Sequence, residues 1–478
     1  MDFEVAPPDQ VLWIWRTLEE AGFETWIVGG AIRDLMLGRP AGDWDFATRA
    51  HPERIMAVFR RTVPIGLDHG TVGVLARDRT LYEVTTFRRD VKTLGRRAVV
   101  EFAESIEEDL SRRDFTVNAL AWHPGRAKLL DPWDGATDLR EKILRTVGDP
   151  SERFAEDLLR VLRALRFAGQ LRFTIEAGTW RALLAAVPEL SQLSPERVQE
   201  EMMKVLTQAQ KPSIALTLYS EAEVFKELYP ELKLGLSFSD SSSGGSSDGA
   251  GVVDRDADRW GVDFEHALRA CDAVSRTRPL VRLSLLMSLV SAAPPGSFSQ
   301  KETDTVPGNR MGEGKRRSIE TLMGRLRFSN ADTKRVVAVT TGFSAVPASE
   351  EPAVLRRWLN QVGTEHFADV ARAWLAGARA ERDSSSRASD TRSFSALRRI
   401  KAVRKILHEH PPLTIADLAL GGSELKELGL RPGPQFGEIL RDLLERVIDR
   451  PEMNNRADLE ALVVQGGFIV ERSPSPER

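Results

Sequence analysis

Two aspartates separated by a single residue are the first side chains in this sequence whose spacing suggests chemistry. Asp43 and Asp45 lie in the stretch GDWDFAT, residues 42–48, where they alternate with apolar residues. On a β-strand, residues i and i+2 point to the same face, so both carboxylates would share one surface and repel each other. Mg²⁺ prefers oxygen ligands and would offset that repulsion. The alternative is an ordinary solvated turn.

The residues before this pair fit the phosphate groups of a nucleotide. Gly29 and Gly30 lie between a predicted strand and a predicted helix in the stretch VGGAIRD, and Arg33 follows one turn later. Glycines let backbone N–H groups approach a ligand, and the start of a helix carries partial positive charge. Mg²⁺ is commonly held by carboxylates together with substrate phosphates. The combination predicts attack of a hydroxyl on an α-phosphate, with pyrophosphate as the leaving group.

Glu83 is the candidate for a third carboxylate that would complete a two-metal site. It lies between apolar residues in the stretch LYEVTTFRR, residues 81–89. An unpaired charge within a strand is unfavourable, which suggests that this one has a partner. The alternative is a glutamate that faces water on an edge strand.

The predicted elements around these residues form a small α/β or α+β unit. Residues 8–22 have the apolar spacing of an amphipathic helix that ends at Gly22, and residues 31–38 of a second helix closed by Gly38. From Pro150 onward the pattern is almost wholly helical. Strands are predicted in the stretches TWIVGG (25–30), WDFAT (44–48), GTVGVLA (70–76) and LYEVTTF (81–87).

Composition describes an ordinary globular chain with several domains. The 478 residues carry a net charge of −3, with 42% apolar and 29% charged residues, and two to four domains are expected. Cys271 is the only cysteine, which excludes an internal disulfide and a Cys-rich metal site. The N-terminus lacks the apolar core of a signal peptide, and no apolar run approaches the roughly 18 residues of a membrane span. We therefore expect a cytoplasmic protein without a membrane partner.

Three polar segments interrupt the helical part. Residues 237–251 and 381–393 are rich in Ser, Gly and Asp, and we expect flexible linkers or loop insertions there. Residues 298–318 lack an apolar period, and we expect them to be disordered.

Five motifs in a fixed order resemble the class II tRNA nucleotidyltransferase / poly(A) polymerase family, a branch of the polymerase-β-like nucleotidyltransferases. The resemblance covers residues 24–175 nearly continuously and extends more weakly to about residue 460. It implies an α+β fold, in which a polymerase-β-like head with a small mixed sheet precedes an all-helical neck, body and tail. The motifs are IVGGAIRDLMLGRPAGDWDFAT, HGTVGV, VTTFRRD, EEDLSRRDFTVNALAW and DPWDGATDLREKILRTVGDPSERFAEDLLRVLRALRF. The implied domains are a catalytic head (1–148), a base-recognition neck (149–206), a body (207–345) and a tRNA-binding tail (346–478).

The resemblance implies a role for each matching residue of the head. Asp43, Asp45 and Glu83 would hold catalytic Mg²⁺. The residues that would contact the triphosphate or the sugar are Gly29, Gly30, Arg33, Arg113, Asp114 and Asn118. For Asp114 the alternative is a cap at the N-terminus of a helix in the stretch FTVNALAW.

Four charged residues at steps of three characterise the predicted neck helix, residues 155–169. Asp157 and Arg160 would be neighbours on one helical face, whereas Arg166 would point away from Asp157. A carboxylate that accepts hydrogen bonds beside a guanidinium that donates them suits the amino group and the ring nitrogen of cytosine or adenine. The same pair rejects guanine and uracil. The resemblance assigns base recognition to the same two residues, and Arg163 and Arg166 complete the predicted nucleotide-binding set. The alternative is an ordinary ion pair between Asp157 and Arg160.

The predicted body resembles an HD-type helical domain that has lost its metal ligands. His266 is present, but Met287 and Ser288 stand where that domain needs a His-Asp pair, and neither can replace those ligands. We therefore expect no hydrolase metal there and a core role for His266.

The expected function is template-independent addition of C and A residues (CCA) to tRNA 3′ ends from CTP and ATP. One stretch departs from the family pattern, because residues 89–102 lack the tyrosine and proline of a loop that relatives adding all of CCA carry. An enzyme that adds only CC or only A is therefore an alternative, and a poly(A) polymerase is another. An inactive RNA-binding relative is a more distant possibility.

Overall fold

The computed structural model describes residues 6–90, 100–232, 263–290, 310–347, 349–380 and 388–465. The chain divides into two compact units, Met1–Tyr229 and Pro230–Arg478. The predicted division into head, neck, body and tail is finer than this and stays a prediction. Within the described residues, no helix combines the length and the apolar character that crossing a membrane requires.

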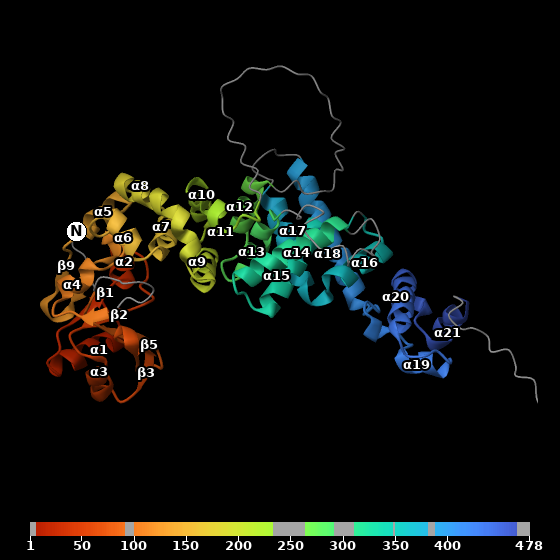
Figure 1. Cartoon of the computed structure of the whole chain (residues 1–478), viewed down its shortest axis with the longest axis horizontal. Coiled ribbons are helices and arrows are strands. Elements are labelled where there is room, and N and C mark those ends of the chain that lie inside the picture. The colour runs from red at the N-terminus through yellow and green to blue at the C-terminus, as the bar shows by residue number, and fades with distance from the viewer. Residues whose placement is uncertain are drawn as a thin grey trace, which may run out of the picture. The chain divides into compact units, whose positions relative to one another are not determined.

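A mixed seven-stranded sheet forms the N-terminal part of the first unit (Figure 1). Strands β2 and β5 at its centre run parallel, and the other neighbouring pairs are antiparallel. The predicted strands are thus confirmed. In sheet order the strands are β3 (Thr62–Gly66), β4 (Thr71–Leu75), β5 (Leu81–Thr86), β2 (Asp45–Thr48), β1 (Thr25–Val28), β8 (Ala121–His123) and β9 (Lys128–Leu130).

Helices pack on this sheet, and one of them marks the face on which Asp45 lies. Val28 and Ala47 pack with Ile106 of helix α4 (Ile106–Ser111) in one apolar cluster. Val28 on β1 pairs directly with Asp45 on β2, and paired residues point to the same face, so Asp45 lies on the face that carries α4. The predicted helices are confirmed as α1 (Asp9–Glu20), beside β1, and α2 (Gly30–Met36); α3 (Pro52–Val58) packs beside β4 and β5.

From Pro150 to Tyr229 the first unit is helical, as predicted, apart from the short strand β11 (Thr174–Ile175), which pairs with β10 (Ile143–Leu144). Helices α7 and α10 approach so closely that a Cβ on Gly169 would lie 2.5 Å from the Cβ of Ala215. Only glycine fits at this crossing. The helices are α6 (Pro150–Glu156), α7 (Leu159–Leu171), α8 (Ala177–Ala186), α9 (Pro195–Gln208), α10 (Pro212–Glu221) and α11 (Val224–Leu228).

The second unit is all-helical in its described residues. Trp358 and Trp374 lie 5.0 Å apart at the centre of its larger apolar cluster, and His266 contacts the carbonyl oxygen of Gly377 at 3.1 Å, so His266 is a core residue. A smaller cluster joins the last three helices. The helices are α12 (Phe264–Ala273), α13 (Pro279–Met287), α14 (Arg310–Arg325), α15 (Asn330–Ser344), α16 (Pro352–Val362), α17 (Phe367–Ala380), α18 (Ala388–His408), α19 (Gly422–Glu427), α20 (Pro434–Asp449) and α21 (Arg456–Gln465).

Two of the three polar segments are partly helical, which corrects the expectation of disorder or flexible loops. Helix α14 includes residues 310–318, because Ile319, Leu322 and Met323 further along the same helix are fully buried and anchor it. Helix α18 likewise includes residues 388–393. The segment 237–251 lies outside the described residues.

Candidate active site

Asp45 and Glu83 are side-by-side on neighbouring strands. In the parallel pairing of β2 with β5, Phe46 is opposite Val84. The residues before them, Asp45 and Glu83, are therefore opposite each other, and both point to the face of the sheet away from Phe46 and Val84. Strand β5 lies between β4 and β2, so Glu83 is not on an edge strand, although its side chain is exposed as that alternative expected. Asp43 precedes the strand, which begins at Asp45, and therefore lies on the adjoining loop rather than on the strand as predicted.

The three carboxylates influence one another electrostatically. Burial raises the pKa of Asp45 to about 6; the negative charges of Glu83 and Asp43 act in the same direction, and the guanidinium of Arg113 opposes them. A concentration of negative charge with too little compensation is what a divalent cation would relieve. In the described part of the chain, no three Asp, Glu, His or Cys side chains are placed to hold a metal by themselves. The acids fit a cation whose remaining ligands are phosphate oxygens of a substrate.

Gly29 provides space beside the acids rather than a free N–H group. Its backbone has φ 76° and ψ −136°, and its N–H donates to the carbonyl oxygen of Leu120 at 3.3 Å. A Cβ at this position would lie 3.2 Å from Nη1 of Arg113 and 3.9 Å from Oδ2 of Asp45. The expectation that Gly29 offers its N–H to a phosphate is therefore corrected, because the glycine lets an arginine and an aspartate approach the same point. Gly30 begins helix α2.

Four of the predicted nucleotide-binding residues form one chain of hydrogen bonds, which is buried except at Arg163, whose side chain is 32% exposed. Arg33 donates from Nη1 to Oδ1 of Asn118 at 2.8 Å, and Asn118 donates from Nδ2 to Oδ1 of Asp114 at 3.0 Å. Arg163 donates from Nε to Oδ2 of Asp114 at 2.8 Å. Burial would raise the pKa of Asp114, but the guanidinium of Arg163 and the other hydrogen bonds outweigh burial and lower it. The chain joins the sheet-bearing part to helix α7.

The helix-cap alternative for Asp114 is wrong. The stretch FTVNALAW forms only a 3₁₀ turn, Thr116–Asn118, and continues into strand β8. Asp114 accepts a hydrogen bond from the N–H of Phe115, but its carboxylate is otherwise held by side chains. Its position in the network therefore comes from tertiary contacts.

Asp109 was not predicted from the sequence, and it holds Arg113 in place. It is 1% exposed, and its Oδ2 accepts from Nη2 of Arg113 at 3.1 Å. Nη1 of the same arginine donates to the carbonyl oxygen of Asn118 at 3.3 Å. Asp109 and Arg113 stand at i and i+4 in the sequence, which is the one signal that could have identified the pair.

Asp157 and Arg160 do not share one helix, which corrects the prediction. The chain breaks between α6 and α7, and Asp157 has an extended backbone with φ −154° and ψ 104°. Its Oδ1 accepts from the N–H of Leu159, and its Oδ2 pairs with Arg197 of α9 at 2.8 Å. The alternative of an ion pair between Asp157 and Arg160 is also wrong. Arg160 instead pairs with Glu156 and donates from Nη2 to the carbonyl oxygen of Arg112 at 3.0 Å.

Arg166 is buried in helix packing and does not join the hydrogen-bond chain. Its Nε donates to Oε2 of Glu201 at 2.6 Å, and Glu201 is fully buried. The ring of Phe167 lies between Arg166 and the two arginines that end the hydrogen-bond chain. Its centroid is 4.1 Å from the guanidinium carbon of Arg166 and 5.3 Å from those of both Arg33 and Arg163. Sequence reasoning missed both Glu201 and Phe167.

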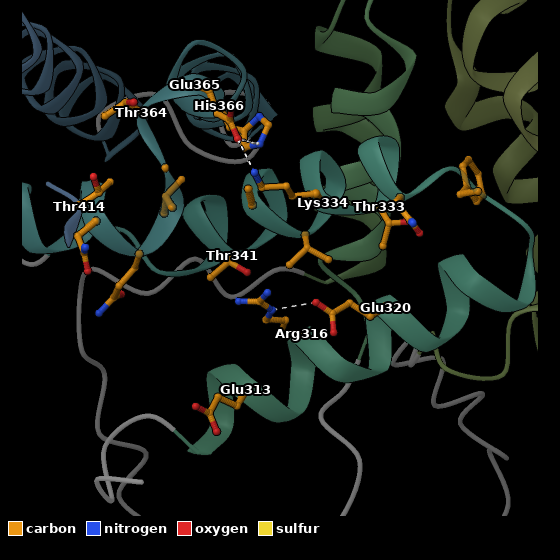
Figure 2. Close-up of a pocket in the computed structure, with 18 of the residues that line it drawn as sticks. Glu313, Arg316, Glu320, Thr333, Lys334, Thr341, Thr364, Glu365, His366 and Thr414 are labelled. Carbon is orange, nitrogen blue, oxygen red and sulfur yellow. Dashed lines mark hydrogen bonds and ion pairs between the residues drawn. The ribbon is translucent and has the colours of Figure 1, made fainter. Parts of the chain in front are cut away.

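A separate pocket of about 900 Å³ lies in the second unit, between α14, α15 and the turn that follows α16 (Figure 2). Four of its charged residues form two ion pairs. Lys334 pairs with Glu365 at 3.0 Å and Arg316 with Glu320 at 2.9 Å. None of the residues predicted to bind metal or nucleotide lines it.

The clustered acids and most of the polar network beside them lie in a stretch of the chain that is similar to a known family. The model of the Poly A polymerase head domain matches residues 25–145, and that of the probable RNA and SrmB-binding site of polymerase A matches residues 172–236. These two stretches of the chain are therefore similar to the head domain and to the RNA-binding region of that family.

Curated relatives named CCA-adding enzyme match the N-terminal half. That of Anoxybacillus flavithermus is 45% identical over 225 residues, which cover 47% of this chain and 56% of the relative. That of Ligilactobacillus salivarius is 43% identical over 234 residues, which cover 48% and 57%. The matched stretch thus spans only about half the length of these relatives.

Solved structures of CCA-adding enzymes match nearly the whole chain. The Bacillus stearothermophilus enzyme in complex with CTP has a TM-score of 0.64 at 27% identity and covers 97% of this chain and 99% of its own. The Thermotoga maritima enzyme complexed with tRNA has a TM-score of 0.54 at 18% identity, with 97% of each chain covered, and supports the fold alone. The predicted α+β fold with a helical remainder is confirmed.

Proposed function

We propose that this chain is a template-independent RNA nucleotidyltransferase that adds C and A residues to tRNA 3′ ends from CTP and ATP. The observation that carries the proposal is the meeting of Asp45 and Glu83 beside Gly29 and Arg113, next to a polar chain that continues into helix α7. The relatives named CCA-adding enzyme, similar over this same part of the chain, support the choice of reaction.

The acids bind Mg²⁺ in this proposal, and the arginines bind phosphate. When bound, Mg²⁺ would neutralise negative charge on the triphosphate and the charge that develops on the attacking hydroxyl oxygen as it loses its proton. Asp45, with a pKa of about 6, is ionised at neutral pH and can serve as a ligand with one neighbouring acid, Asp43 or Glu83, while phosphate oxygens of the substrate supply the other ligands. Arg113, held by Asp109, is oriented toward Gly29 and can contact the triphosphate. Catalysis then rests on positioning and electrostatics, without a covalent enzyme intermediate.

Asp157 and Arg160 recognise the base in this proposal, although they stand on separate elements. Each carboxylate oxygen accepts more than one hydrogen bond, so Asp157 can accept from the amino group of cytosine or adenine while it is held by Arg197. Arg160 donates to the ring acceptor. Guanine and uracil present a carbonyl where the amino group should be, which leaves buried acceptors facing each other.

Single-nucleotide extension of defined tRNAs tests the proposal. Purified protein with Mg²⁺ is given tRNAs that lack CCA or end in C or CC, with each nucleotide alone and with CTP and ATP together. Addition that stops at CCA supports the proposal, and the Asp43→Ala and Asp45→Ala variants should abolish it without changing the unfolding temperature. Long adenosine ladders would indicate a poly(A) polymerase instead, and RNA binding without any transfer would indicate an inactive relative.

One second candidate is favoured by a specific observation. The altered stretch at residues 89–102 is the feature that points to an enzyme that adds only CC or only A. Residues 91–99 lie outside the described residues. Arg89 and Asp90 end strand β6 (Arg88–Asp90), which pairs antiparallel with strand β7 (Val100–Phe102). The same assay separates the candidates, because a partial enzyme stops after CC or extends only the tRNA that already ends in CC.

A further inference from the structure

An exposed apolar patch lies on the face of the sheet that bears the acids. Val63 and Ile65 on edge strand β3 are 43% and 45% exposed, and Leu81 at the start of β5 is 44% exposed. We call these three residues the β3–β5 patch. Large aliphatic side chains are usually buried, so a cluster of exposed ones indicates a binding surface. The groups around the cluster then indicate which ligand it binds.

Strand register places the β3–β5 patch on the same face as Glu83. Val63 pairs with Gly73, and Gly73 pairs with Glu83, so the three positions form one row across the sheet. Leu81 stands two residues from Glu83 along β5 and shares this face. Ile65 lies where the register of β3 shifts, and its side chain is placed on this face by its position over Gly73. Gly73 has no side chain, and its missing Cβ would lie 2.6 Å from Cδ1 of Ile65 and 3.0 Å from Cδ1 of Leu81. Ile65 and Leu81 therefore close over Gly73 as one continuous surface.

The two sides of Asp45 are chemically different, and this difference suggests an occupant for the patch. On the β1 side lie Gly29 and Arg113, which suit a triphosphate. On the β5 side lies Glu83, followed by the β3–β5 patch. A nucleotidyl transfer brings two substrates to one pair of acids, and the triphosphate accounts for the first side. We infer that the patch on the second side binds the 3′-terminal nucleosides of the RNA that is extended, an inference that rests on the proposed function.

Charge at the rim of the patch fits this occupant. Four arginines at the adjoining strand ends are exposed, and the hairpin between β4 and β5 contributes one aspartate, Asp78. RNA phosphates pair with arginine, whereas the flat faces of its bases and the carbon skeleton of its riboses pack on apolar side chains. An apolar surface with a basic rim beside the carboxylates is suited to a single-stranded RNA end. The arginines are Arg60, Arg61, Arg77 and Arg79.

Serine substitutions in the patch, with a matched control, test the inference. Leu81→Ser and Ile65→Ser remove apolar contact area from exposed positions, so the fold should persist. Leu184→Ser is the control, because Leu184 on α8 is 39% exposed and lies outside the patch. The KM for tRNA lacking CCA should rise about tenfold for each patch variant, while the KM for CTP and the unfolding temperature stay as in the control. Anisotropy of a labelled tRNA gives its Kd independently of turnover.

The two readouts separate failure of this inference from failure of the proposed function. If the wild-type protein extends tRNA but the patch variants keep the KM and Kd of the Leu184→Ser control, the inference is overturned and the function stands. A rise confined to the KM for CTP would also overturn it, since the patch would then serve the nucleotide. If no protein extends tRNA but the patch variants bind it about tenfold more weakly than the control, the proposed function fails and the RNA surface is supported.

Discussion

Replacing Gly29 with alanine is expected to disturb both the fold and the site. The backbone at Gly29, with φ 76° and ψ −136°, lies where a residue with a Cβ is strained. The new methyl group would also stand 3.2 Å from Nη1 of Arg113, closer than most Cβ contacts. That guanidinium cannot move freely, because Asp109 and the carbonyl oxygen of Asn118 hold it. The substitution therefore acts on the backbone and on Arg113 together.

The expected loss of stability follows from these two effects. A strained backbone position costs about 1–3 kcal/mol, and displacement of Arg113 adds to this. For a unit of this size, each kcal/mol lowers the unfolding temperature by about 2–4 °C. Because Arg113 faces the proposed triphosphate site, the KM for CTP should also rise, by about tenfold if one charged contact is lost.

Gly30→Ala is the matched control for this prediction. A Cβ on Gly30 would lie 3.4 Å from Nη2 of Arg33, an ordinary contact, and Gly30 is the first residue of α2, where alanine is well tolerated. Thermal unfolding and CTP titration of both variants are compared with the wild type. The reasoning is refuted if Gly29→Ala is as stable as Gly30→Ala and binds CTP equally well.

Three further outcomes are expected. Glu201→Gln should lower the free energy of unfolding in urea by about 3 kcal/mol, because it leaves the buried Arg166 without its charged partner. The preference among nucleotides should not change. A changed preference would show that Arg166 takes part in base recognition. Burial alone would raise the pKa of Asp109, but the two neighbouring arginines lower it, so its contribution to the free energy of unfolding should be complete above a pH of about 4 and disappear on further acidification. Asp109→Asn should flatten that part of the urea–pH profile, and an unaltered profile would contradict this assignment. Arg197→Ala should lower the free energy of unfolding by less than about 1 kcal/mol, because its ion pair with Asp157 is exposed. It should nevertheless raise misincorporation of G and U. Unchanged fidelity would show that Arg197 does not position Asp157.

Local signals in the sequence predicted the strands of the sheet and the strand positions of Asp45 and Glu83 correctly, but placed Asp43 on the strand when it lies on the adjoining loop. The strands around Asp45 and Glu83 alternate apolar and polar residues, and a sheet translates this alternation directly into faces. Gly29 was singled out for the right position but with the wrong role. Sequence shows that a residue without a Cβ is needed there, whereas only the structure shows that Leu120 takes its N–H and that Arg113 needs the space.

The neck was harder to predict because its contacts are distant in the sequence. Regular steps of three made Asp157 and Arg160 resemble one helix face, but the Asp157 carboxylate holds the N–H of Leu159 and interrupts the helix there. Its partner Arg197 is 40 residues away, and nothing in the local pattern marks that pair. Helix α14 was missed for a related reason, since its N-terminal turns are charged and only Ile319 and later residues are anchored by burial.

The chain of hydrogen bonds from Arg33 through Asn118 and Asp114 to Arg163 also limits which substitutions such a protein can accept during evolution. Each inner member satisfies two neighbours. Replacing Asn118 leaves one donor and one acceptor without this partner, and replacing Asp114 leaves two donors without it. No single step along this chain is neutral, and a change at one position is tolerated only with a matching change at the next. Lineages are therefore expected to inherit these four residues as a block, while the exposed ion pairs of the helical unit vary freely around them.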